Sequence, residues 1–174
     1  MSAENARRRL VRQLQGACSG ELAAGFAYRG HARSLPPGPE RNRILEIEAE
    51  EWHHRSLVDG LLRELGARPS AIREVIFWCI GHAIAALCRI GGWFIPMYGA
   101  GRLERSNIIE YEDAARYASE CGHDEMVDCL LTMAEVEWEH ERFFRERIAQ
   151  HPLLRVFPLW DAPPPKHAIR QHVA

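Results

Sequence analysis

Residues 51–54 read Glu-Trp-His-His, and residues 137–140 repeat the pattern as Glu-Trp-Glu-His. In each copy a glutamate stands three residues before a histidine, so on a helix both side chains point from the same face. Upstream of each copy lies a glutamate that is followed seven residues later by a tyrosine: Glu21 and Tyr28, then Glu104 and Tyr111. The chain therefore carries the order Glu, Tyr, Glu-Trp-x-His twice.

This repeated set matches the ligands of dinuclear sites in helical bundles. One glutamate from each of two helices, together with Glu-x-x-His from each of two others, binds two iron or manganese ions in such proteins. The predicted metal ligands are Glu21, Glu51, His54, Glu104, Glu137 and His140. A bundle whose charges fall in register by coincidence is the alternative, and the second copy of the pattern argues against it.

The rest of the chain is predicted to form a series of helices separated by glycine and proline residues. Glycine and proline breaks predict helices over residues 6–34, 41–65, 70–90, 97–121 and 124–150. Gly66 and Gly122 are expected to end the second and fourth helices, and Ser70 and Asp124 to cap the helices that follow. Pro96 is expected to force a break before the fourth helix. Strand signals are nearly absent.

The turns between these helices predict the architecture. Short connections make the first two helices an antiparallel pair, and likewise the last two. The stretch 66–96 can travel the length of a bundle, because a helix of some twenty residues covers roughly 30 Å. We therefore expect an all-α, ferritin-like four-helix bundle with a long apolar helical crossover between the helix pairs. Residues 1–150 would form this bundle, and the Pro-rich residues 151–174 a loosely held C-terminal tail.

The apolar stripe of the second helix places two of the proposed ligands in the core. It reads Ile47, Glu51, His54, Val58, Leu61 and Leu65, whereas Glu50 and His53 lie on a polar line. The last helix, with Glu137 and His140, and the first, with Glu21, have equivalent stripes. Buried carboxylates must be protonated, paired or bound to metal, and no lysine or arginine lies on these stripes. Oxygen and imidazole ligands suit iron or manganese, and the absence of thiolates argues against structural zinc.

The fourth helix offers two candidate ligands. Glu104 lies on one line with Ile108 and Tyr111, and Glu110 lies on another with Tyr117; both lines are tolerably apolar. The seven-residue spacing from Glu104 to Tyr111, which repeats that of the first helix, favours Glu104. Glu110 would then support the site or lie on the surface.

The composition and the apolar crossover bear on nucleic-acid binding, cellular location and membrane contact. A net charge of −2 gives no overall attraction to nucleic acid. Five scattered cysteines without a Cys-x-x-Cys pair predict reduced thiols and a cytoplasmic location. Residues 75–88 carry no charge, but a transmembrane helix needs about 20 apolar residues. This helix either packs on the bundle or partly faces lipid, as in an enzyme bound peripherally to the inner face of the membrane.

Several stretches resemble the demethoxyubiquinone hydroxylases, a family of ferritin-like di-iron carboxylate proteins. Residues 20–31 resemble the first metal-binding helix of that family. The Glu51/His54 motif leading to residues 66–70, Gly-Ala-Arg-Pro-Ser, is similar to its second helix and following turn. The segments around Glu104 and Glu137 look like the third and last ligand helices. The resemblance covers residues 6–150, with Glu110 where the family usually has histidine.

The resemblance implies a di-iron mono-oxygenase, an oxidoreductase that uses O2 to hydroxylate the ring of a lipophilic ubiquinone precursor at a membrane surface. It implies that Glu51 and Glu137 bridge both irons at the catalytic centre. Glu21 with His54, and Glu104 with His140, would complete the two sites. The same ligands suit manganese, the electron donor is not indicated, and a homo-oligomer is compatible with the pattern.

Two other functions fit the ligand set. The first is a ferritin-like or rubrerythrin-like oxidase or peroxidase acting on iron or peroxide, although the Cys-x-x-Cys domain of rubrerythrin is missing. The second is a metal-stabilised bundle that binds a lipid or a partner without turnover. Oxygen consumption, iron uptake and quinone binding would separate the three.

Overall fold

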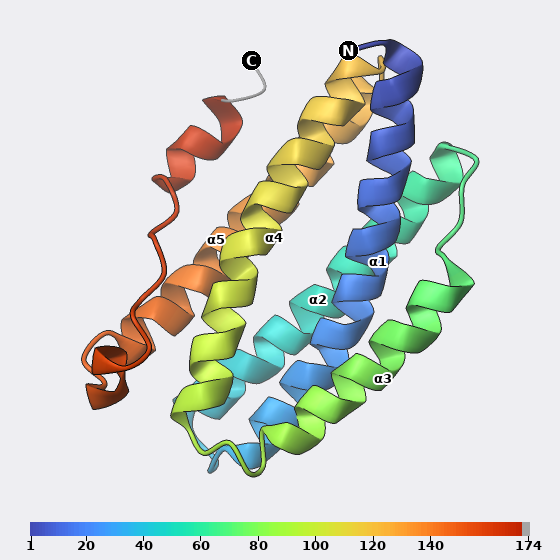
Figure 1. Ribbon diagram of the computed structural model, residues 1–174. Helices are drawn as coiled ribbons and strands as arrows, with labels where there is room; N and C mark the ends of the chain where they lie inside the picture. The colour runs from blue at the N-terminus through green and yellow to red at the C-terminus, as the bar shows by residue number, and fades with distance from the viewer. Residues whose placement is uncertain (172–174) are drawn as a thin grey trace. The chain divides into compact units, whose positions relative to one another are not determined.

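The structure, a computed structural model, describes residues 1–171; its regular elements over that range are all helices, without a strand (Figure 1). This confirms the prediction of an all-α helical bundle. The helices are α1 (Ala3–Ser34), α2 (Pro39–Glu64), α3 (Ala71–Leu87), α4 (Phe94–Glu120) and α5 (Val127–Ile148), with short 3-10 helices η1 (Asp124–Met126), η2 (Pro152–Arg155) and η3 (Lys166–Gln171). Residues 172–174 of the predicted tail lie outside the described residues. None of the described helices is long and apolar enough to cross a membrane.

The chain divides into two compact units, each of which has its own helices. The first unit, Val11–Trp93, contains most of α1 together with α2 and α3. Its apolar core includes Leu14 of α1 and Ile44, Ile47 and Leu62 of α2, all fully buried. The second unit combines the first ten residues with the chain from Phe94 onward. Its fully buried side chains include Met97, Leu130, Phe144 and Ile148.

Two glycines end helices as the sequence predicts. Gly66 has φ +65°, and the N–H of Ala67 donates to the carbonyl of Leu62 at 2.8 Å. Gly122 has φ +81°, and the N–H of His123 donates to the carbonyl of Ala118 at 2.9 Å. Both are Schellman endings, in which a left-handed residue lets the chain satisfy the last carbonyls of the helix. Each ending turns the chain out of its helix, before α3 and before α5.

The starts of the helices differ from the prediction in three places. α4 begins at Phe94, so Pro96 lies inside its first turn, where an N–H has no acceptor within the helix and its loss costs little. Ser70 stands at the start of α3, but its side chain makes no capping hydrogen bond. Asp124 opens the 3-10 turn η1, and α5 begins only at Val127.

In the first unit, α3 packs on α1 through glycines. A Cβ atom at Gly30 would stand 2.3 Å from Ala85 Cα, and one at Gly81 would stand 2.7 Å from the carbonyl oxygen of Ala23. Only a residue without a side chain allows this approach of the two backbones. Gly81 is the one buried residue of α3, so most of the apolar surface of this helix remains exposed.

In the second unit, the C-terminal tail is held firmly, which the sequence did not indicate. The tail runs back along α5 (Figure 1), and Ile169 is buried. The Trp160 indole N–H donates to Glu141 Oε1 at 2.7 Å, and the Trp138 indole N–H donates to the carbonyl of Pro164 at 2.9 Å. Arg170 forms ion pairs with Asp128 and Glu135. The expectation of a loose tail is therefore wrong for the described residues.

Candidate metal centre

The first unit contains a buried triad of two carboxylates and one imidazole. Glu21 comes from α1, and Glu51 and His54 come from α2; each side chain is at most 3% exposed. Each residue offers one ligand atom, and these atoms lie within 4.8 Å of one another. The apolar stripe of α2 produces this arrangement, because Ile47 and Val58, on the same face, are also fully buried.

The neighbouring pair on α2 faces the surface instead. His53 is exposed, and Glu50 forms an ion pair with Arg43 at 3.2 Å. The burial that the sequence predicts for Glu51 and His54, in preference to Glu50 and His53, is therefore observed. Their role as metal ligands stays a prediction.

The second unit contains an equivalent triad. Glu104 comes from α4, and Glu137 and His140 come from α5; all three are fully buried, and their ligand atoms lie within 4.8 Å of one another. His140 Nδ1 lies 3.2 Å from Glu137 Oε2. The side-chain amide of Asn107 donates to Glu104 Oε2 at 2.9 Å, which fixes one oxygen of that carboxylate. The contact of Asn107 with Glu104 could have been anticipated, because the two residues are three apart on the same face of α4.

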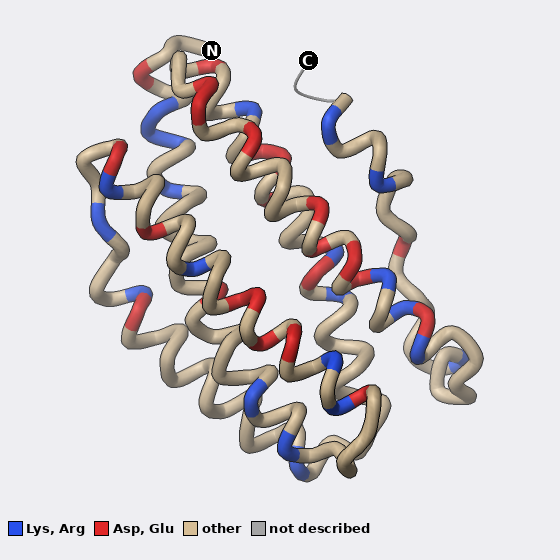
Figure 2. Tube along the Cα trace, turned by 180° about the vertical axis from the view of Figure 1, so that it is seen from behind, with Lys and Arg blue, Asp and Glu red and all other residues tan. Residues whose placement is uncertain are grey.

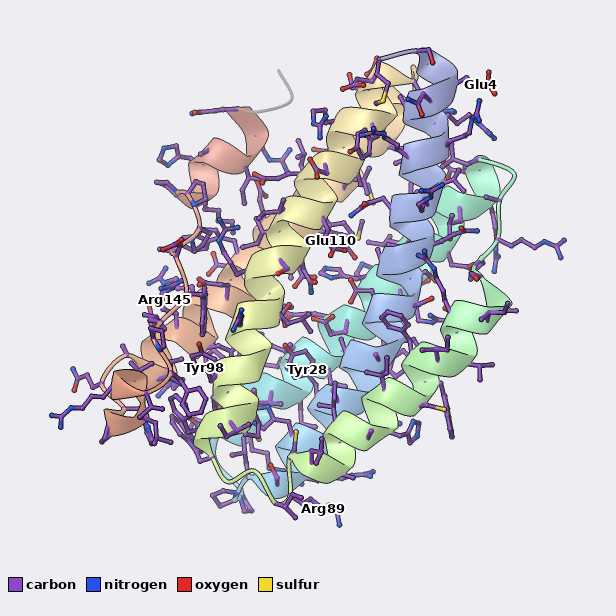
Figure 3. All side chains as sticks on the ribbon, in the orientation of Figure 1. Glu4, Tyr28, Arg89, Tyr98, Glu110 and Arg145 are labelled. Carbon is purple, nitrogen blue, oxygen red and sulfur yellow. The ribbon has the colours of Figure 1, made fainter. Side chains whose placement is uncertain are left out.

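The two candidates on α4 have different environments. Glu104 is fully buried, whereas Glu110, the residue of α4 that is labelled in Figure 3, is exposed. Partial loss of hydration raises the pKa of the Glu110 carboxyl, and the negative charges of Glu137 and Asp113 raise it further. Burial therefore favours Glu104 as the residue that shares a cluster with Glu137 and His140, in agreement with the spacing argument.

Each triad has the composition of a site for a divalent cation. Two carboxylate oxygens held a few ångströms apart and away from water repel each other strongly unless a proton or a cation lies between them. Oxygen and nitrogen ligands without thiolate suit iron or manganese. The residues present therefore fit the predicted metal. Tyr28 and Tyr111 are buried as well, and their role in supporting the ligands stays a prediction.

Other polar residues are buried without having been predicted from the sequence. His31 is only 2% exposed, and burial lowers its pKa from 6.5 to about 4. Glu48 Oε1 accepts hydrogen bonds from Arg29 Nε at 2.7 Å and from the Trp52 indole at 3.3 Å. The contact of Trp52 with Glu48 could have been anticipated, because the two residues are four apart on α2. No local pattern marks His31.

Comparisons with known proteins give a partial match. The chain is 33% identical, over 60 residues, to proteins named 3-demethoxyubiquinol 3-hydroxylase from Francisella tularensis subsp. novicida (strain U112), subsp. tularensis (strain SCHU S4) and subsp. holarctica (strain LVS). The match covers 34% of this chain and 28% of the length of each relative. No model of a protein family matches the chain, and no solved structure matches it. The similarity is therefore distant and partial, and it points to an oxidoreductase.

Proposed function

We propose that this protein is a di-iron mono-oxygenase that uses O2 to hydroxylate the ring of a lipophilic, demethoxyubiquinol-like quinone precursor. The observation that carries the proposal is the pair of buried triads, each with two glutamates and a histidine whose ligand atoms lie within 4.8 Å of one another. The partial similarity to 3-demethoxyubiquinol 3-hydroxylases supports the substrate class.

Under this proposal Glu21, Glu51 and His54 would hold iron in the first unit, and Glu104, Glu137 and His140 would hold iron in the second. Bound iron would supply the electrons and open coordination positions that O2 activation requires. The protein itself fixes the ligands and excludes water. Asn107 orients Glu104 through its 2.9 Å hydrogen bond, and the close approach of His140 to Glu137 limits the rotation of both side chains. Manganese would be held by the same donors.

A lipophilic substrate would reach such an enzyme from a membrane. The exposed apolar residues of α3 and the turn after it support contact with a lipid surface: Ile72, Val75, Ile76, Trp78, Ile80, Ile84, Leu87 and Ile90. In Figure 2 the trace of α3 carries no charged residue between Glu74 and Arg89. We therefore include peripheral association with the inner face of the cell membrane in the proposal.

The first experiment is a metal count. Protein expressed with ample iron is expected to contain two irons per chain, and the Glu51→Ala and Glu104→Ala variants to lose them. The second step supplies demethoxyubiquinol, a chemical reductant and isotopically heavy O2. One heavy oxygen in the product supports the mono-oxygenase.

Other outcomes favour other functions. Iron uptake into a cage, or peroxide consumption without quinone hydroxylation, would favour the ferritin-like oxidase or peroxidase. A folded protein that stays metal-free after loading with ferrous iron would contradict the proposal.

A further inference from the structure

A pocket of about 500 Å³ opens between α1 and α3 in the first unit. Gly30 of α1 forms part of its wall, where the backbones of α1 and α3 lie close together. Phe26 and His82 add an aromatic wall, with their ring centroids 4.2 Å apart. Three arginines also line the pocket: Arg29, Arg33 and Arg89.

The charged residues that line this pocket are all arginines. Arg29 is paired with Glu48 at 2.7 Å. Arg33 and Arg89 are exposed, and their guanidinium groups have no hydrogen-bond or ion-pair partner among residues 1–171. None of the lining residues is acidic. Two arginines whose charge no acidic residue compensates therefore line one concave site, and guanidinium groups bind phosphate well.

The surface next to the pocket is apolar. Ile90 lines the pocket and is 81% exposed, and the exposed residues Ile84 and Leu87 precede it along α3. Figure 3 shows Arg89 near the end of α3, with its side chain directed away from the helices. Cations beside an exposed apolar helix match the surface of a bilayer, where phosphates lie directly above acyl chains.

We propose that this pocket binds the phosphate of an anionic phospholipid through Arg33 and Arg89, and so anchors the C-terminal end of α3 at the membrane surface. The inference rests on the membrane-contact part of the proposed function and is independent of the metal chemistry. The anionic lipid headgroup would bind residues outside the metal centre.

A second copy of this chain is a less suitable occupant. Two α3 faces related by a twofold axis and packed antiparallel would bring Arg73 of one copy toward Arg89 of the other. The only acidic residue of α3, Glu74, is already paired with Arg55. Like charges would face each other across the contact, whereas a membrane that contains anionic lipid offers the opposite charge.

Arg33 also lies in the last turn of α1, and Arg89 lies two residues beyond the end of α3; a cation near a helix C-terminus stabilises the helix. A purely structural role would affect stability and leave lipid binding unchanged. The test must therefore measure binding directly.

The experiment is vesicle flotation of the full chain, with vesicles of phosphatidylcholine alone and of phosphatidylcholine mixed with phosphatidylglycerol. The wild type is expected to bind the mixed vesicles more tightly and to be released by salt. Each arginine near the surface contributes about 1 kcal/mol, so Arg33→Gln combined with Arg89→Gln is expected to weaken binding about 30-fold. Arg12→Gln combined with Arg102→Gln removes the same charge from exposed positions outside the pocket and is the matched control.

Several results would overturn the inference. They are equal binding to both vesicle types, an equal loss in the control variant, and saturable binding of inorganic phosphate without vesicle binding. Assembly of the chain through α3, detected by sedimentation, would also do so. Arg33→Lys with Arg89→Lys keeps the charge and should retain most of the binding, which guards against misfolding as the cause of a loss. The iron content of the glutamine variants is expected to match that of the wild type, so failure of the lipid site and failure of the metal centre are distinguishable.

Discussion

Gly25 of α1 lies directly against the indole ring of Trp52 of α2: a Cβ atom at residue 25 would stand 2.5 Å from Trp52 Cε2. Trp52 follows Glu51 in the chain, so the packing of its ring against α1 constrains the rotation of α2 about its own axis. That rotation turns Glu51 and His54 into the interior of the protein. A glycine without chemical function thus helps to place two of the proposed metal ligands.

The contact predicts that Gly25→Ala destabilises the protein. Overpacking a tight contact costs about 1–3 kcal/mol, which exceeds the gain of about 1 kcal/mol from replacing glycine in a helix. Gly20→Ala, on the same helix with nothing within 4 Å of the new methyl group, provides the control and should stabilise. Urea unfolding of both variants measures the difference. Equal stabilisation of the two would show that the Trp52 ring moves aside freely.

The two glutamates of α4 are expected to behave differently toward metal. Glu104→Gln should abolish one or both irons, because it removes a buried ligand oxygen. In metal-free protein the same change should increase stability, on the order of 1 kcal/mol, because it relieves repulsion between buried carboxylates. Glu110→Gln, at an exposed position, should leave the iron content unchanged. Metal analysis and thermal melting of both variants test this, and loss of iron only in Glu110→Gln would reverse the assignment.

His31 predicts a pH dependence of stability. Burial lowers its pKa from 6.5 to about 4, so between these values the unfolded chain binds a proton that the folded chain does not. The free energy of unfolding is therefore highest above pH 6.5 and falls as the pH is lowered toward 4, by at most about 1.4 kcal/mol per pH unit. His31→Leu should remove about 2 kcal/mol of the loss between pH 7 and pH 5. Urea unfolding at both pH values measures it. The exposed His53 provides the control as His53→Gln, since its imidazole meets water in both states.

The tail is expected to contribute to the stability of the second unit. A Cβ atom at Gly101 of α4 would stand 2.6 Å from the Trp160 ring, and the Trp160 indole donates to the buried Glu141. Trp160→Ala removes both the packing and the hydrogen bond and should cost about 2–3 kcal/mol. Val156→Ala, at a residue that is 70% exposed, should change stability by less than about 0.5 kcal/mol. Similar losses in the two variants would contradict the anchoring role of Trp160.

Local features of this protein were predictable from sequence. The endings at Gly66 and Gly122 follow from the preference of glycine for positive φ, which acts within a few residues. The burial of Glu51 and His54 follows from the apolar period of their own helix. The predicted start of α4, at residue 97, is three residues too late, because the first turn of a helix tolerates a proline such as Pro96.

Features that depend on distant residues were not predictable. The lines through Glu104 and Glu110 are similarly apolar, and only the packing of α4 separates a buried side chain from an exposed one. The tail has no helical period, so its binding to α5 through Trp160 and Arg170 leaves no pattern in the sequence. His31 is buried by tertiary packing alone. The assignment of the six residues as metal ligands remains a prediction, because ligand geometry is a property of the loaded centre.

Lys166 is the only lysine in the sequence, and its ammonium group lies 2.9 Å from Glu139 Oε1, where the tail meets α5. The side chain remains partly exposed. Amine-directed reagents therefore have a single side-chain target in these 174 residues. A fluorophore attached there would break the ion pair and stand close to the indole of Trp138, which contacts the same part of the tail. Quenching of that fluorophore would report, in real time and from one defined position, whether the tail leaves α5.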